Sequence, residues 1–179
     1  MTAPAAAPAV DGIDARIHRA ALDLLRARGP RAVTMQGVTE ATGIAKTTIY
    51  RRYPNRRALL AAALEELGER LPEPVSVDAE QRVRWAVTHS VEVVTAGIGV
   101  GGFAALLTGE DPDFSDAFRT ILGGQRAQVI DALGCDEATG NTLIDMIVGS
   151  YVAEHARSGG VDDTWTDRVA SLVGQLVAR

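Results

Sequence analysis

Polar and basic side chains gather in one short stretch, between positions 46 and 56, where each can donate hydrogen bonds. A helix advances about 100° per residue, so Lys46 and Tyr50 would share one side of it and Ile49 and Tyr53 another. Lysine can donate to guanine, and hydroxyl and guanidinium groups can donate to phosphate oxygens. One side would therefore pack while the other contacts duplex DNA. The DNA-contacting candidates in this stretch are Lys46, Thr47, Thr48, Tyr50, Arg51 and Arg56.

Two short helices and a tight turn are needed to position these side chains. Thr34 is typical of an N-cap, because its hydroxyl can accept a hydrogen bond from a free amide at the start of a helix over 35–42. Gly43 then permits the left-handed conformation that a sharp turn requires. The second helix is predicted over 45–52 and would carry the DNA-contacting side.

A third helix is predicted directly after this pair. Pro54 ends the second helix because proline lacks an amide hydrogen and disfavours helical geometry in the residue before it. Asn55 can cap the next helix, which opens with Arg56 and Arg57. A helix start with two arginines suits a phosphate group.

The segment from Gly43 to Leu60 resembles the DNA-binding signature of the TetR family of transcriptional repressors, Gly-Val-Ser-x-x-Thr-Leu-Tyr-x-x-Phe-x-Ser/Asn-Lys-Glu-x-Leu. The spacing agrees, including the interval from Tyr50 to Tyr53, and the similarity extends upstream over 13–29 as the family's first helix. Ala45 stands where the family usually has serine, which weakens capping of the second helix, and Arg57 stands where it usually has glutamate.

The resemblance implies a homodimer that binds a palindromic operator and is released by a small-molecule inducer. Two recognition helices related by a two-fold axis would engage major-groove faces about 34 Å or a multiple apart. By position in the motif, Lys46, Thr47 and Thr48 would contact base edges or the adjacent backbone, with Lys46 on guanine. The expected phosphate contacts are Thr34, Tyr50, Arg51 and Arg56.

Charge supports this reading independently. Between residues 13 and 57 there are ten basic and three acidic residues, a net charge of +7, although the whole chain carries −5. The remainder is therefore strongly acidic. A basic end of this kind attracts the phosphate backbone, so the acidic total does not argue against DNA binding.

Helical periodicity continues through the rest of the chain and predicts an all-α fold, with a three-helix head on a larger helical body. We expect a flexible tail over 1–12, a DNA-binding domain over 13–58 and a ligand-binding and dimerisation domain over 59–179. Proline and polar residues over 72–78 predict a break, and the glycines at 97–102 predict a second. The expected body helices are 55–71, 79–96, 102–108, 113–133, 136–157 and 162–177, with Asp111, Asp136 and Asp162 as helix starts.

The last two helices are joined by the short turn at 158–160 and should pack as an antiparallel hairpin. In the family that it resembles, such a pair forms a four-helix interface with its two-fold mate. The small residues Gly149, Ser150 and Ala153 would allow close helix approach. An ordinary core within one chain is the alternative.

A cavity in the body would make the protein a switch. Aromatic walls with a few polar groups are typical of ligand pockets. His89 shares a helix face with Trp85 and Glu92, at the spacing i, i+4 and i+7. The alternative is that His89 is a partly buried structural residue that binds no ligand. The candidate lining residues are Trp85, His89, Glu92, Phe103, Phe114, Phe118, Tyr151 and His155.

Other classes of protein fit less well. Ser150 and His155 do not form a motif for nucleophilic catalysis, and no HExxH metal pattern occurs, so we expect no enzyme, no metal and no cofactor. A single cysteine, Cys135, suits a reducing cytoplasm. The sequence contains no run of eighteen apolar residues, so we expect no membrane span. A helical protein-interaction module that has lost DNA binding remains the alternative.

Overall fold

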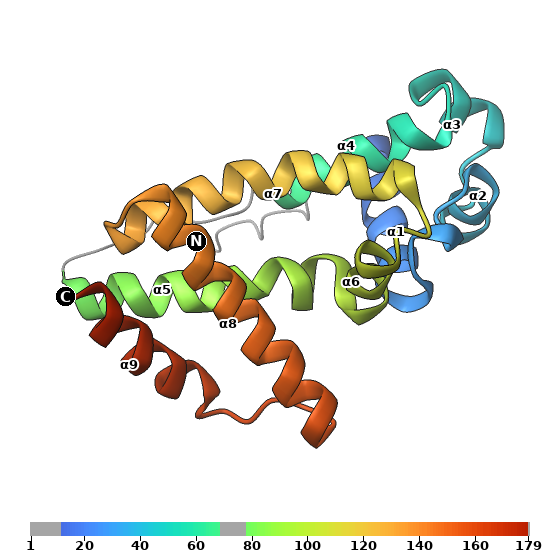
Figure 1. Cartoon of the computed structure of the whole chain (residues 1–179). Helices are drawn as coiled ribbons and strands as arrows, with labels where there is room; N and C mark the ends of the chain where they lie inside the picture. Colours follow the sequence, from blue (N-terminus) through green and yellow to red (C-terminus); the bar gives the residue numbers. More distant parts are fainter. Residues whose placement is uncertain (1–11, 69–77, 179) are drawn as a thin grey trace, which may run out of the picture.

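The computed structural model describes residues 12–68 and 78–178. Within these ranges the chain is built from helices and contains no strand, so the all-α prediction is confirmed. The expected tail over 1–11 and most of the break over 72–78 lie outside the described residues. Figure 1 shows the order of the elements, which are α1 (Ile13–Arg28), η1 (Pro30–Ala32), α2 (Met35–Thr42), α3 (Lys46–Arg52), α4 (Arg56–Gly68), α5 (Ala79–Glu92), η2 (Val93–Ile98), α6 (Gly99–Thr108), α7 (Pro112–Leu133), α8 (Glu137–Ser158) and α9 (Trp165–Val177).

The helix starts and the turn of the head follow the sequence signals. Thr34 Oγ1 accepts a hydrogen bond from the amide of Gly37 at 2.9 Å and caps α2. Gly43 ends α2 with a φ of 69°, as the predicted left-handed turn requires. Asn55 Oδ1 accepts from the amide of Ala58 at 2.9 Å at the start of α4. All three predictions are confirmed.

The predicted caps in the body are confirmed at two of three positions. Asp111 and Asp136 accept hydrogen bonds from amides in the first turns of α7 and α8. Asp162 does not cap α9, which begins at Trp165. Its carboxylate accepts instead from the amide and the hydroxyl of Thr164, at 2.8 Å and 2.6 Å. It therefore orders the turn before the helix, and the predicted start at 162 is wrong by three residues.

The glycines at 97–102 interrupt the regular α-helix, but no loop separates the two helices. The chain stays helical through them, as a π-helix in η2 followed by a kink at Gly99, where φ is 69°. Arg26 of α1 donates from Nε to the carbonyl oxygens of Ala96 and Gly97, at 2.7 Å and 3.0 Å. A Cβ at Gly99 would lie 3.4 Å from the backbone of Arg26, which is an ordinary contact, so the positive φ and not the space favours glycine here.

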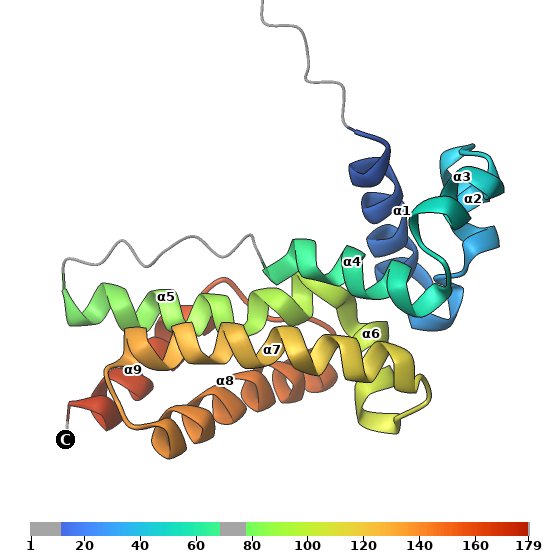
Figure 2. The ribbon, with the colours of Figure 1, turned by 90° about the horizontal axis from the view of Figure 1, so that it is seen from above.

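Two apolar cores hold the molecule together. The proximal core joins α1 to α4 with η2, α6 and the first half of α7, and its buried members range from Ile17 to Phe118 without including α5. The distal core joins α5, the second half of α7, α8 and α9. Helix α4 continues through the expected domain boundary at residue 58, and Leu59 is fully buried in the proximal core. Figure 2 shows α1 to α4 at one end, with α5 and α7 extending away from them.

The last two helices diverge more than an antiparallel hairpin would. Helix α8 packs against α5 and α7, while α9 packs mainly against α5, and Figure 1 shows the two opening away from their connection. The reason lies in the buried face of α9, where Trp165 and Val173 join the distal core beside Val83 and Val87 of α5. Arg168 of α9 still pairs with Glu154 of α8 at 2.8 Å.

The continuous helical stretch Ala79–Thr108 is long and apolar enough, by length and composition alone, to cross a membrane. No such span was expected from the sequence. In the fold this stretch contains α5, η2 and α6, and these elements contact α1, α7, α8 and α9. Core helices of globular proteins pass the same test of length and composition.

Candidate nucleic-acid interface and body cavity

Helix α3 lies at the outer end of the head, away from the body, as both views show (Figures 1 and 2). Its inner side is anchored by Ile49, which is fully buried, and by Tyr53 at its C-cap, which is 8% exposed. Lys46, Thr47 and Arg51 are exposed, and Tyr50 is 45% exposed although its ring is large. The predicted division into a packing side and an outward side is therefore confirmed.

Lys46 and Tyr50 form a pair on the outward side of α3. The Nζ atom of Lys46 lies 5.8 Å from the centroid of the Tyr50 ring, within the range of a cation–π contact. Thr48 is half-buried beside them, and Thr34 uses its hydroxyl oxygen to cap α2. A hydroxyl can accept and donate at once, so Thr34 keeps a hydrogen to donate. Contacts of these residues with DNA remain a prediction.

Arg56 is placed differently from the sequence expectation. Its guanidinium donates to the carbonyl oxygens of Val33 and Pro30, both at 2.7 Å, and forms an ion pair with Asp111 at 2.5 Å. Asp111 is only 5% exposed. With its donors committed to three groups of the same chain, Arg56 ties α4 to the start of α7 and does not face outward for a phosphate.

The pKa of Asp111 reflects this environment. Burial alone would raise the pKa, but hydrogen bonds from Arg56 and from the amide of Phe114, together with the charge of Arg56, hold it below its usual value. Asp111 is therefore ionised whenever the pair with Arg56 is formed at neutral pH.

A polar chain that the sequence analysis missed lies between α1, the end of α3 and α4. Tyr53 donates its hydroxyl hydrogen to Asp14 at 2.9 Å, so the contact at 2.7 Å with His18 Nε2 requires that His18 donates to Tyr53. His18 Nδ1 lies 3.2 Å from a carboxylate oxygen of Glu66. The sequence carried one signal for this chain. Tyr53 stands where the family pattern has phenylalanine, so its hydroxyl is an addition to that pattern.

Removal of the Tyr53 hydroxyl tests this chain. We expect Tyr53→Phe to lower the free energy of unfolding by about 1–3 kcal/mol, because Asp14 and His18 each lose a partner in a partly buried site. Urea denaturation measures the loss, and Tyr50→Phe, at an exposed hydroxyl, is the matched control with no expected change. Equal stability of the two variants would contradict the assignment.

The pKa of Tyr53 predicts how the stability of the protein depends on pH in alkaline solution. Burial, then the hydrogen bond to Asp14 and its negative charge, raise the pKa of Tyr53 to about 12. Because this value lies above the ordinary one of about 10, the stabilisation is complete below pH 10 and is lost as pH rises through about 12.

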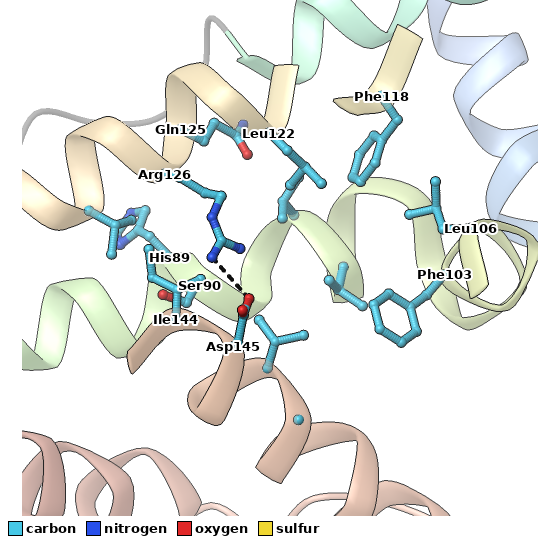
Figure 3. A pocket seen from close by; sticks show the side chains of 15 residues that line it. His89, Ser90, Phe103, Leu106, Phe118, Leu122, Gln125, Arg126, Ile144 and Asp145 are labelled. Carbon is cyan, nitrogen blue, oxygen red and sulfur yellow. Dashed lines mark hydrogen bonds and ion pairs between the residues drawn. The ribbon is translucent and has the colours of Figure 1, made fainter. Parts of the chain in front are cut away.

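The body contains a cavity of about 270 Å³ at the junction of the two cores. Its walls come from α5, η2, α6, α7 and α8, as Figure 3 shows in part. Of the eight residues predicted to line it, His89, Phe103 and Phe118 do so. The lining residues that the sequence analysis missed are Ser90, Val93, Val94, Leu106, Leu122, Gln125, Arg126, Val129, Ile144, Asp145, Val148 and Gly149.

The other predicted lining residues lie outside this cavity. Phe114 is fully buried and stacks on Phe118 with the ring centroids 5.7 Å apart. Tyr151 packs edge-on against Trp165 in the distal core, and its ring also stacks near that of His155. The last two candidates, Trp85 and Glu92, do not line the cavity but contact His89, which does. The ring of Trp85 stacks on that of His89 with the centroids 4.2 Å apart, and a carboxylate oxygen of Glu92 lies 3.5 Å from His89 Nε2.

Comparison with known proteins bears on this arrangement. The family model for bacterial regulatory proteins of the tetR family matches residues 17–78, which include most of α1 and all of α2 to α4. This segment is therefore similar to the N-terminal domain of tetR-family regulators. No match is found among curated protein sequences. Among the described residues, no group of three or more histidine, cysteine or carboxylate side chains is placed to hold a metal ion.

Solved structures extend the similarity from the head to the whole fold. A TetR transcriptional regulator from Legionella pneumophila matches with a TM-score of 0.69 and 14% identity, over 94% of this chain and 99% of that one. Salmonella enterica GusR gives 0.66 and 18%, over 93% and 95%. The fatty acid degradation regulator FadR from Bacillus halodurans gives 0.62 and 18%, over 92% and 93%. The chain has the fold of DNA-binding transcriptional regulators.

Proposed function

We propose that the protein is a homodimeric repressor that binds a palindromic operator and is released by a small-molecule inducer. The observation that carries the DNA-binding part is the outward face of α3, where Lys46, Thr47, Tyr50 and Arg51 are exposed at the far end of the head. The net charge of the segment over 13–57 supports it. We place its action in the cytoplasm, where the operator is.

Dimerisation is supported by apolar side chains that the single chain leaves exposed on α8 and α9. Met146 is 57% exposed, and Leu172 and Leu176 are 61% and 47% exposed. Met146 shares a helix face with Gly149 and Ala153, at the spacing i, i+3 and i+7, and small residues there permit close approach of a second chain. We propose this face as the contact between two copies.

Release by an inducer is supported by where the cavity lies. Val93 and Val94 line it from η2, and the neighbouring carbonyl oxygens of η2 accept hydrogen bonds from Arg26 of the head. A molecule in the cavity therefore contacts an element that is bonded to α1. It can change operator affinity only if it binds the two conformations of the dimer with unequal affinity.

Selection from a random duplex library tests the proposal. We expect the purified protein to enrich a palindrome, and its affinity for that duplex to fall by at least about 10-fold between 50 and 200 mM salt, because phosphate contacts release counterions. Sedimentation would establish the dimer in the same sample. Failure of a folded dimer to enrich any sequence would favour the alternative, a helical protein-interaction module.

A further inference from the structure

Each polar side chain around the cavity makes at least one hydrogen bond within the protein. Five of the fifteen lining residues carry polar side chains. Ser90 donates to the carbonyl oxygen of Ala86 at 2.7 Å, and Gln125 donates to that of Leu67 at 3.3 Å. His89 Nδ1 lies 2.8 Å from the carbonyl oxygen of Trp85. These three side chains therefore use hydrogen bonds within the protein.

The two charged groups neutralise each other. Arg126 donates from Nη2 to the carboxylate of Asp145 at 2.9 Å. It also donates from Nε to the side-chain oxygen of Asn141 at 2.7 Å and from Nη2 to the backbone oxygen of Asn141 at 2.9 Å. Figure 3 shows the ion pair between α7 and α8, across one side of the cavity. A carboxylate that approached Arg126 would lie beside Asp145 and be repelled, and a cation that approached Asp145 would lie beside Arg126. Neither sign of charge finds an unpaired partner.

The remaining walls are apolar and the space is small. Phe103, Phe118 and Leu122 line it, together with Leu106, Ile144 and four valines. A cavity of about 150 Å³ holds one benzene ring, so the volume of about 270 Å³ suits roughly two fused rings.

We propose that this cavity binds an uncharged, predominantly apolar molecule about the size of two fused rings. The proposal rests on the regulatory function proposed above, whose inducer it assigns to a chemical class. Burial of apolar surface supplies the affinity, and the Arg126–Asp145 pair excludes ions from the cavity.

Two probes of similar shape and different charge test the class. Isothermal titration calorimetry of the full-length protein would compare 2-acetylnaphthalene, which is neutral, with 2-naphthoate, which is anionic at pH 7. We expect the neutral probe to bind at least about 10-fold more tightly, because each factor of ten needs only 1.4 kcal/mol of difference. Equal affinities, a preference for the anion, or no binding of either probe up to its solubility would overturn the proposal.

Variants locate the binding and test the role of the ion pair. Asp145→Asn leaves Arg126 without its counter-charge, so the affinity for 2-naphthoate should rise and the preference should shrink or invert. Val148→Phe should fill the cavity and reduce binding of the neutral probe by at least about 10-fold, whereas Thr142→Phe, at an exposed position on the same helix, should not. Retained binding in a folded Val148→Phe variant would place the probe elsewhere and overturn the assignment.

Operator binding is measured separately on the selected duplex. A protein that binds the duplex but neither probe refutes the ligand class alone. A protein that binds the neutral probe but no duplex refutes the regulatory function and leaves the chemistry of the cavity standing.

Discussion

A Lys46→Ala, Tyr50→Ala double variant is expected to lose operator affinity by at least about 100-fold, because a specific contact is worth about 1–3 kcal/mol and each dimer carries two copies of both side chains. Neither side chain contributes to the core. Lys46 is exposed, and Tyr50 contacts it through the cation–π pair on the outward side of α3. The variant should therefore remain folded and dimeric.

Fluorescence anisotropy with the selected duplex measures this loss, and sedimentation confirms the dimer. Arg119→Ala is the control for charge alone, because it removes one positive charge per chain from an exposed position on α7, in the body. We expect less than about a 3-fold change for the control, since a distant surface charge is screened by salt. Comparable losses in both variants would mean that general electrostatics, and not α3, governs binding.

An Asp111→Ala variant is expected to lose about 3–5 kcal/mol of unfolding free energy, the usual cost of leaving one member of a buried ion pair without its partner. Arg56 would keep its bonds to Pro30 and Val33 but lose the carboxylate at 2.5 Å. Helix α7 would also lose its N-cap. Both effects fall on the junction between the head and the body.

Urea denaturation at pH 7 measures this effect, with Asp113→Ala as control. Asp113 is two residues away and half-exposed, and its oxygen lies 4.0 Å from Arg56, so its loss should cost less than about 1 kcal/mol. The deficit of Asp111→Ala should also shrink in acid. Because folding lowers the pKa of Asp111, the stabilisation is present above the unfolded value of about 3.9 and disappears as pH falls below it. A deficit that did not change between pH 7 and pH 3 would contradict the ion pair.

Local signals predicted the head well because its conformation is decided within a few residues. Thr34, Gly43 and Asn55 each act on amides or dihedral angles of their immediate neighbours, and all three lie where they were expected. The outward side of α3 follows from the helical repeat alone. These features need no knowledge of distant partners.

Long-range partners account for the errors. Arg56 has the composition of a phosphate ligand, and only the approach of Asp111, fifty-five positions away, shows that it is used internally. The glycines at 97–102 indicated a break between helices, and nothing in the sequence shows that Arg26 donates to the carbonyl oxygens of Ala96 and Gly97.

The cavity was predicted from aromatic residues, whereas most of its apolar side chains are aliphatic. Aliphatic side chains fill cores and line cavities alike, so composition does not distinguish the two uses. Arg126 and Asp145 carried a detectable signal, as opposite charges on neighbouring predicted helices, but their pairing depends on how those helices cross.

The proximal core limits where two proteins of this fold can be joined into a chimera. Leu59 and Leu60 are buried in the same cluster as Ile98 and Phe114, so a chimera joined after residue 58 would cut through packed side chains that belong to both parents. A junction after Phe118 fares no better, because it would separate α5 from α8 and α9, which share the distal core with it. Transplanting a new operator preference should therefore succeed by changing only the outward residues of α3.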